Sequence, residues 1–352
     1  MSLQTAAPTD PSPATAAAPL AGARPAVVAR LREAWLLGDV PVANRVLLAP
    51  LAGIGNWFVR LQARRYGAGL AVSEMVSSFG LHYGNPRTCN EMLRIHPDEH
   101  PVSVQLFGPD PEVMRSAAAR VAEAGADLID INMGCPVPKV VKTGAGAALI
   151  DDPDRAVAVA RAAREGSGLP VTVKLRSGTR GGERTGVELA RRLVADAGVA
   201  GIGFHPRPAS AHHRGAPDYA LAAALVASLP APVLLTGGLR SAAAAHRAFE
   251  QTGAAAVLLA RGTLGYPWLF AEVLGDDPRP SPGAIRAELD WVIDRAEEHL
   301  GPARAARYLR KFYPWYLARL GASHALQDAM VRSQTLTQAR GLLGGLAVVA
   351  AA

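Results

Sequence analysis

The chain has 352 residues, of which 49% are hydrophobic and 5% aromatic, with a formal net charge of +7 and a pI of about 9.8. This composition supplies a buried core, and the positive charge permits an acidic partner such as nucleic acid without demonstrating one. Two cysteines with no CxxC pair or Cys/His cluster exclude a disulfide framework and give no indication of a metal site, which fits a reducing, cytoplasmic setting.

The first 25 residues are rich in Pro, Ala, Ser and Thr and lack the basic start and apolar centre of a signal peptide. We expect a disordered tail over residues 1 to about 25, followed by a lead-in to residue 35. At the other end, "LLGGLAVVAAA" is too short to cross a bilayer, so no membrane partner is expected.

Short apolar runs recur along the next part of the chain and predict eight strands. They are residues 45–50, 70–75, 102–108, 128–134, 171–176, 201–207, 233–238 and 256–262. The runs are apolar throughout, as in strands that are buried on both faces. Segments between them, such as "PEVMRSAAARVAEAGA", have helical periodicity and end at glycine.

Eight strands that alternate with helices predict an α/β fold, a (β/α)8 barrel, over residues 36–280. A doubly wound sheet is the structural alternative, but its glycine-rich loop is missing after the first strand, which ends in "APLAG". The "GAGAAL" at 144–149 lies ten residues after a strand and lacks the third glycine of that loop. From residue 281 to 352 only helical patterns remain, which predicts a small all-helical domain.

Polar residues follow the predicted strands at their carboxyl ends, where barrels of this kind place their active sites. They are Glu74, Gln105, Asn132, Cys135, Lys174, Arg176, His205 and Arg207. A core does not accept so many polar groups without partners, so one shared pocket is the economical interpretation.

The loops after the last two strands have the features of a phosphate site. Gly237 and Gly238 would present backbone N–H groups, and Arg261 could pair with a phosphate in a bidentate manner. A tight glycine turn without a ligand is the alternative interpretation.

Several motifs occur in the order in which tRNA-dihydrouridine synthases carry them. They are "APLAG", "SEM", "VQLFG", "DINMGCPVPKVVKTGAGAAL", "VKLRSG", "FHPR", "TGG" and "LLARGTLGYPWLF". The chain resembles the bacterial B-type branch of that family over roughly residues 40–340. The segment around Cys135 is its most specific part.

The resemblance implies reduction of a tRNA uridine to 5,6-dihydrouridine with FMN as cofactor and NADPH, or NADH, as reductant. It implies these positions for FMN: Pro50, Leu51 and Ala52 against the ring, Gln105 and Lys174 at its polar edge, and His205, Thr236, Gly237, Gly238, Ala260 and Arg261 towards the phosphate. It implies these positions for tRNA: Asn132 on the uracil, Cys135 as proton donor, and Lys139, Lys142 and Arg207 on the RNA.

Two departures from the family pattern stand out. The usual "NGD" is replaced by Thr236-Gly237-Gly238, which keeps backbone contacts to a phosphate but loses any contact of the Asp. The usual "GVTD" after the first strand is replaced by "GIGN" at 53–56, where Asn56 can still cap a helix.

Cys135 has two interpretations when it is considered alone. A thiol is mostly protonated at neutral pH, so it can deliver a proton to C5 of a uracil whose C6 receives a hydride. Free cysteines are also often small buried hydrophobes. Cys89, in "PRTCNEM", has no comparable neighbours and is expected to be structural or incidental.

The C-terminal segment indicates an RNA partner. Residues 302–340 contain seven Lys/Arg and one Asp, and Arg304, Arg307, Arg310 and Lys311 recur at helical spacing among aromatic residues. Such a face can follow phosphates, although a solvated face over an aromatic core is the simpler interpretation. Two other functions stay open: a flavin enzyme for a free pyrimidine or another small molecule, and a non-catalytic RNA-binding or regulatory protein.

Overall fold

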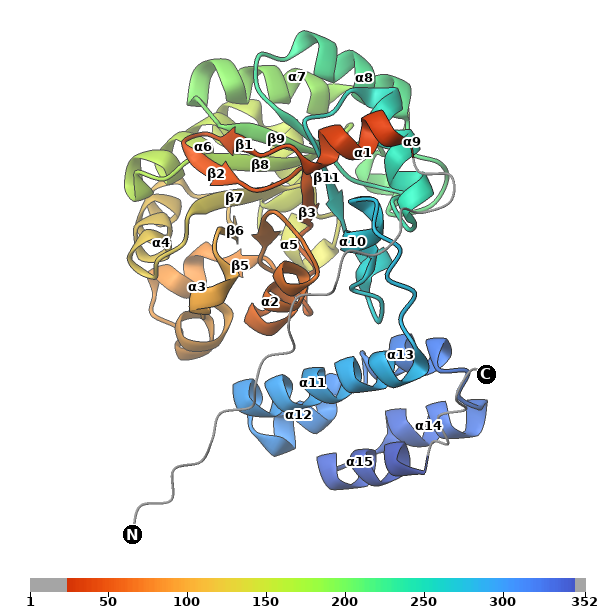
Figure 1. Cartoon of the computed structure of the whole chain (residues 1–352). Helices are drawn as coiled ribbons and strands as arrows, with labels where there is room; N and C mark the ends of the chain where they lie inside the picture. The colour runs from red at the N-terminus through yellow and green to blue at the C-terminus, as the bar shows by residue number, and fades with distance from the viewer. Residues whose placement is uncertain (1–23, 346–352) are drawn as a thin grey trace.

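The computed structural model describes residues 24–345, and its central element is a closed barrel of parallel strands (Figure 1). The strands are β3 (Val46–Leu48), β4 (Ala71–Val72), β6 (Val102–Phe107), β7 (Leu128–Met133), β8 (Val171–Arg176), β9 (Gly201–His205), β10 (Val233–Leu235) and β11 (Ala256–Leu259). Each pairs with its successor, and β11 pairs with β3, which closes the barrel. The predicted (β/α)8 fold is confirmed.

The second strand is shorter than the predicted 70–75. Only β4 lies within those bounds, and a separate short strand, β5 (Val76–Ser77), begins after the predicted end; both pair with β6. Residues 73–75 lie between β4 and β5, so their side chains leave the regular alternation of a strand at the end where the site is expected.

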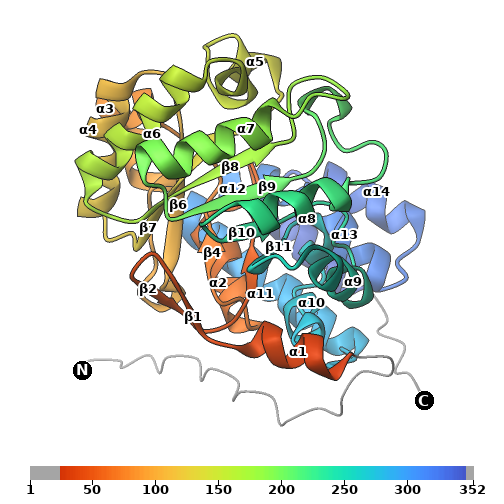
Figure 2. The same ribbon diagram turned by 90° about the horizontal axis from the view of Figure 1, so that it is seen from above.

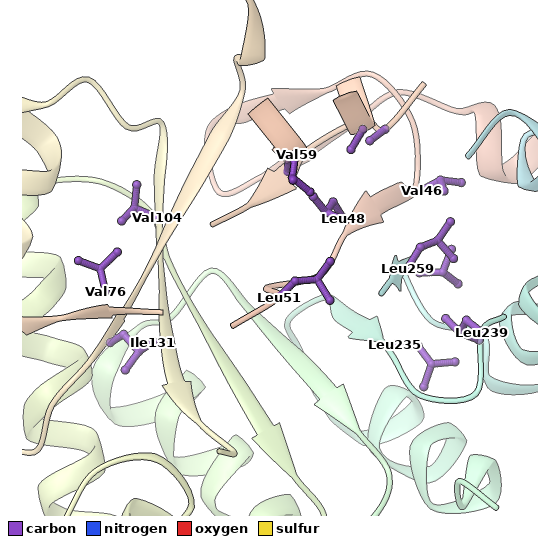
Figure 3. Packing of buried hydrophobic residues seen from close by; sticks show 14 of the residues in the cluster. Val46, Leu48, Leu51, Val59, Val76, Val104, Ile131, Leu235, Leu239 and Leu259 are labelled. Carbon is purple, nitrogen blue, oxygen red and sulfur yellow. The ribbon is translucent and has the colours of Figure 1, made fainter. Parts of the chain in front are cut away.

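Helices surround the barrel. They are α2 (Trp57–Arg65), α3 (Ser78–His82), α4 (Pro111–Glu123), α6 (Pro153–Ser167), α7 (Thr185–Arg192), α8 (Tyr219–Ser228), α9 (Ala242–Thr252) and α10 (Leu269–Val273). Apolar side chains on the outer face of the strands pack against them. Figure 3 shows part of this layer, where Val46 and Leu48 of β3 lie beside Leu259 of β11.

The alternation of side chains along each strand determines where polar groups collect. On β7, Ile129, Ile131 and Met133 belong to the layer under the helices, so Leu128, Asp130 and Asn132 point into the barrel. Near the amino ends of the strands the barrel interior is apolar, with Leu128 among the residues that fill it. Near the carboxyl ends the interior is polar. A polar pocket can therefore form only at the carboxyl ends of the strands.

Two strands that the sequence reading missed, β1 (Trp35–Leu37) and β2 (Val40–Val42), form a hairpin before the barrel. Gly38 adopts a φ of 66° in its two-residue turn, so the Gly-Asp pair between two β-rich runs was an available signal. Leu37 and Val42 are buried against the lower barrel interior. The hairpin thus closes the end of the barrel opposite the site.

The N-terminal lead-in contains a helix, α1 (Pro25–Arg32), which begins with a proline that needs no amide donor there. In Figure 2, α1 and the hairpin lie on the opposite side of the molecule from the short helix α5 (Pro138–Val141). The tail expected over residues 1 to about 25 lies almost entirely outside the described residues.

Five helices follow residue 281 and lie beside the barrel (Figure 1). They are α11 (Pro282–Leu300), α12 (Pro302–Leu309), α13 (Tyr313–Arg319), α14 (His324–Arg332) and α15 (Leu336–Gly344). Buried Glu288 of α11 accepts hydrogen bonds from Gln62 and Tyr66 on the barrel side, each at 2.7 Å. Within residues 24–345, no helix combines the length and the apolar character that a bilayer span requires.

Candidate active site

A cavity of about 380 Å³ opens at the carboxyl ends of the barrel strands. All site residues expected from the sequence line it except two, Lys139 and Lys142. Those two are exposed on α5 and at its end, beyond the cavity wall. The expectation of one shared pocket is met for these residues, with both lysines outside it. Glu74, which was expected in the same pocket, does not line it and instead lines a separate cavity beside the C-terminal helices.

Cys135 lies on the loop directly after β7, half-buried and facing the cavity. Asn132 fixes the start of this loop, because its Oδ1 accepts the N–H groups of Gly134 and Cys135 at 3.2 and 2.9 Å. The Cys135 carbonyl in turn accepts the N–H of Ala147 at 3.0 Å. The thiol is thus carried by a loop that is held from both sides.

The "GAGAAL" segment supports this loop by packing. A Cβ on Gly146 would lie 2.7 Å from the Cys135 carbonyl oxygen, and Gly146 has a φ of 63° that L-residues rarely adopt. The close approach requires glycine. The second glycine of the segment therefore serves the cysteine loop and not a nucleotide phosphate.

Lys174 and Arg176 are neighbouring cations on β8 with different environments. Arg176 donates to the carbonyls of Gly134, Pro208 and His212 at 2.9, 3.1 and 2.7 Å, so it braces the cysteine loop. Lys174 has no hydrogen-bond partner within the described part of the chain. Burial, with the charge of Arg176, lowers the pKa of Lys174 to about 8.

His205 is a neutral group in the cavity wall. Burial, together with nearby cations of which Lys174 is the strongest, lowers its pKa to about 2. Arg207 approaches its Nε2 to 2.9 Å, so the neutral ring accepts this hydrogen bond. A Cβ on Gly237, whose φ is 109°, would lie 2.5 Å from the His205 Cδ2, so only glycine lets the backbone lie against this ring.

The far end of the cavity is cationic and has the features of an anion site. Arg240 and Arg261 reach it without a hydrogen-bond or ion-pair partner among residues 24–345, and burial plus the charge of Arg240 lowers the pKa of Arg261. No Asp or Glu of the described chain lines the cavity. Uncompensated arginines beside the exposed backbone of Gly238 favour a bound phosphate over an unliganded turn.

The departure at Thr236 has a local explanation. The Thr236 hydroxyl donates to the carbonyl of Leu258 at 3.0 Å, so this side chain connects the end of β10 to β11. It is buried and leaves only backbone for a ligand.

Five residues at or below the cavity with charged, polar or sulfur-containing side chains were not predicted from the sequence: Met75, Asp130, His212, His213 and Arg240. Asp130 could have been found, because strand alternation turns it to the same side as Asn132. Arg240 follows the glycine turn by two positions and was also within reach. The two histidines lie in a loop without periodicity, where the sequence contains no signal.

Comparison with known proteins identifies relatives over most of the chain. The sequence pattern of the dihydrouridine synthase (Dus) family matches residues 47–348. The tRNA-dihydrouridine synthase B of Xanthomonas axonopodis pv. citri is 36% identical over 306 residues, covering 85% of this chain and 91% of that protein. The protein of that name from Pseudomonas aeruginosa is 35% identical over 309 residues, with coverages of 85% and 91%. A probable tRNA-dihydrouridine synthase of Rhodobacter capsulatus is 38% identical over 296 residues, with coverages of 82% and 90%.

Solved structures share the architecture at low identity. A 2-naphthoyl-CoA reductase complex aligns with a TM-score of 0.55 and 13% identity over 70% of this chain and 52% of that chain. Histamine dehydrogenase from Rhizobium sp. 4-9 aligns with a TM-score of 0.54 and 14% identity over 70% and 48%. This likeness concerns the barrel fold alone.

Proposed function

Because this chain belongs to the dihydrouridine synthase family, we propose that it reduces specific uridines of tRNA to 5,6-dihydrouridine, with Cys135 as the proton donor. The resemblance to the B-type branch is confirmed by the relatives named above. The observation that carries the proposal is the position of Cys135, on a braced loop at a cationic cavity that is large enough for a cofactor.

The cavity suits a flavin mononucleotide. Arg240 and Arg261, whose side chains have no partner in the described part of the chain, would hold its phosphate with Gly237 and Gly238. We expect His205, Thr236 and Ala260, which also line the cavity, between the phosphate and the ring. The residues that would lie along the ring are Pro50, Leu51, Ala52, Gln105 and Lys174. When bound and reduced by a nicotinamide nucleotide, for which we propose NADPH, FMN supplies the hydride for C6 of the uracil.

The chain's own groups supply the rest of the reaction. Asn132 would orient the uracil, Cys135 would deliver its proton to C5, and Arg207 would contact the RNA at the cavity. The target base must leave the tRNA stack to enter a cavity at the strand ends. Exposed Lys139 and Lys142 lie beyond the cavity wall, where they would contact phosphates of the RNA. We place this reaction in the cytoplasm, and no metal is required.

The proposed function is tested by mapping dihydrouridine in tRNA from a strain that lacks the gene. We expect one or more positions to lose the modification and to regain it when the parent gene is restored. A strain in which every position stays modified would contradict the proposal, and free uridine turned over in place of tRNA would favour the small-molecule alternative.

The phosphate end can be tested by ligand choice. The double change Arg240→Met and Arg261→Met should weaken FMN binding by roughly two orders of magnitude, because two charge-assisted contacts are lost. Riboflavin, which has no phosphate, should bind parent and variant equally. The measurement is flavin fluorescence titration of the apoprotein, and an equal loss for both ligands would mean that the arginines only support the fold.

The basic face of the helical region is smaller than its sequence suggests. Arg304 pairs with Glu91 at 2.6 Å, Arg310 donates to the Ser333 carbonyl at 2.9 Å, and the Lys311 Nζ donates to the Gly53 carbonyl at 2.7 Å. Only Arg307 of the four is exposed without a hydrogen-bond or ion-pair partner in residues 24–345. Arg310 is therefore unsuited to a test of RNA binding.

Arg307→Glu should weaken tRNA binding and lower the salt dependence of the binding constant by about one to two counterions. Arg30→Glu is the matched control, because it makes the same charge change on exposed α1, away from the site. FMN content should stay normal in both. Equal affinities of the two variants for tRNA, measured across a salt series, would show that Arg307 is a solubility feature.

A further inference from the structure

Three polar side chains lie side by side in the barrel interior, below the cysteine loop. Gln105 of β6, Asp130 of β7 and Thr172 of β8 occupy paired positions of neighbouring strands. The Gln105 Nε2 and the Thr172 hydroxyl donate to the two carboxylate oxygens of Asp130, each at 2.6 Å. All three are at most 4% exposed, so these bonds replace water around the carboxylate.

The chain of hydrogen bonds continues upward to the cysteine. The Gln105 Oε1 accepts from the Asn132 Nδ2 at 2.9 Å, and the Asn132 Oδ1 accepts the Cys135 N–H at 2.9 Å. A continuous path therefore connects the buried carboxylate of Asp130 to the backbone of the residue that we propose as the acid.

The direction of every bond in this path is fixed from both ends. An ionised carboxylate only accepts and a backbone N–H only donates, whereas an amide side chain can turn over and exchange its N and O. If Gln105 turned over, its oxygen would face the Asp130 carboxylate. If Asn132 turned over, its NH₂ would face the N–H groups of Gly134 and Cys135. The two ends thus require the same single orientation of both amides.

In this orientation one N–H of Asn132 makes only a weak hydrogen bond, which a ligand could replace. Its oxygen accepts two N–H groups, and one of its own N–H bonds goes to Gln105. The other N–H points at the Met75 Sδ, 3.8 Å away, and sulfur is a weak acceptor. A uracil carbonyl could take over this N–H without breaking the path to Cys135.

We propose that Asp130 is a positioning residue, which fixes through Gln105 and Asn132 both the loop of Cys135 and the one N–H of Asn132 that a uracil can accept. The catalytic consequence rests on the proposed function, whereas the hydrogen-bond path can be tested without any reaction. Burial raises the pKa of Asp130 to about 6, against the hydrogen bonds from Thr172 and Gln105, so at pH 7 the carboxyl is mainly the pure acceptor that the path needs.

The sharpest test reverses the donor and acceptor roles in the two hydrogen bonds that Gln105 makes to positions 130 and 132. Asn132→Asp places a second carboxylate beside Gln105, whose amide can donate to only one of the two. We expect this variant to lose roughly 2–6 °C in Tm, as for one unmet buried hydrogen bond. Asp130→Asn should change little, because the new amide can donate to the Thr172 hydroxyl, which rotates to accept.

The double variant Asp130→Asn/Asn132→Asp should then be more stable than Asn132→Asp alone. In it the new amide at position 130 donates to Gln105, Gln105 turns over, and its NH₂ donates to the new carboxylate at position 132. Every group is satisfied, with both hydrogen bonds of Gln105 reversed and those from the Thr172 hydroxyl and from the N–H groups of Gly134 and Cys135 unchanged. A second change that restores Tm is expected only if the two positions act through Gln105.

The role in holding Cys135 needs a second measurement, the rate of Cys135 alkylation by iodoacetamide in a Cys89→Ala background. We expect a shift of at least threefold in Asn132→Asp and a return towards the parent rate in the double variant. Additive Tm losses, or one alkylation rate in all four proteins, would overturn the proposal. Because neither measurement uses tRNA, a failure of the proposed function would leave both outcomes readable.

Discussion

Cys135→Ala should slow the oxidation of the NADPH-reduced holoenzyme by unmodified tRNA by roughly two to four orders of magnitude, the usual contribution of a positioned general acid. Reduction of the holoenzyme by NADPH should proceed at the parent rate, because the thiol takes no part in that step. Folding and FMN content should also be normal, since the loop is held by the backbone and by Asn132, Arg176 and Gly146.

Single-turnover oxidation under anaerobic conditions is the measurement that isolates this step. Cys89→Ala is the matched control, because it removes the other thiol, which is also half-buried but lies outside the cavity. Its rate should equal that of the parent. If the Cys135→Ala protein also reacts at the parent rate, the thiol is structural and another group must donate the proton.

The sequence was most informative where backbone geometry follows from local pattern. Apolar runs located every barrel strand, and carboxyl-end positions such as Gln105 and Lys174 identified the cavity. The N-terminal hairpin was missed because each of its strands has only three residues, although Gly38 marks its turn. Short runs of this length carry little periodicity, so turn chemistry was the one usable signal.

The sequence was least informative where a side chain has a choice of partners. Arg307 and Arg310 belong to the same basic pattern, yet Arg310 donates to the Ser333 carbonyl whereas Arg307 has no hydrogen-bond or ion-pair partner among residues 24–345. Helical spacing gives the face of a residue but not the segment that folds back onto it. The role of Asp130 could not be predicted for a related reason, because its hydrogen-bond partners Gln105 and Thr172 come from strands far apart in the sequence.

The same limit applies to the glycines. "GAGAAL" and "TGG" both look like phosphate loops, and only the structure separates them. Gly146 packs under the Cys135 carbonyl, whereas Gly237 lies against His205 in the cavity wall, which also contains Arg240 and Arg261, without partners in the described part of the chain. The neighbours of a glycine, which are distant in sequence, determine whether its backbone faces a ligand or the protein.

Lys174→Met should slow the reduction of bound FMN by NADPH by about two to three orders of magnitude, as expected when a preorganised charge is removed from a dry site. Lys174 lines the cavity and has no hydrogen-bond partner among the described residues, and its proposed place is against the flavin ring. Lys142→Met is the matched control, because this lysine is exposed outside the cavity. Its reduction rate should equal that of the parent.

The pH dependence of FMN binding gives the same residue an independent test. Burial, with the charge of Arg176, lowers the pKa of Lys174 from 10.5 to about 8, so the flavin-free protein loses this charge above about pH 8 while the unfolded chain keeps it to about 10.5. The charged form therefore costs stability below pH 8, and the free energy of unfolding of the apoprotein should rise between pH 8 and 10.5.

An anionic ligand favours the charged form of Lys174, so the affinity for FMN should fall over that same pH range, because binding then takes up a proton. Lys174→Met should remove both slopes and stabilise the apoprotein at pH 7 while it slows reduction. A variant that keeps the parent slopes and the parent reduction rate would show that Lys174 does not face the flavin.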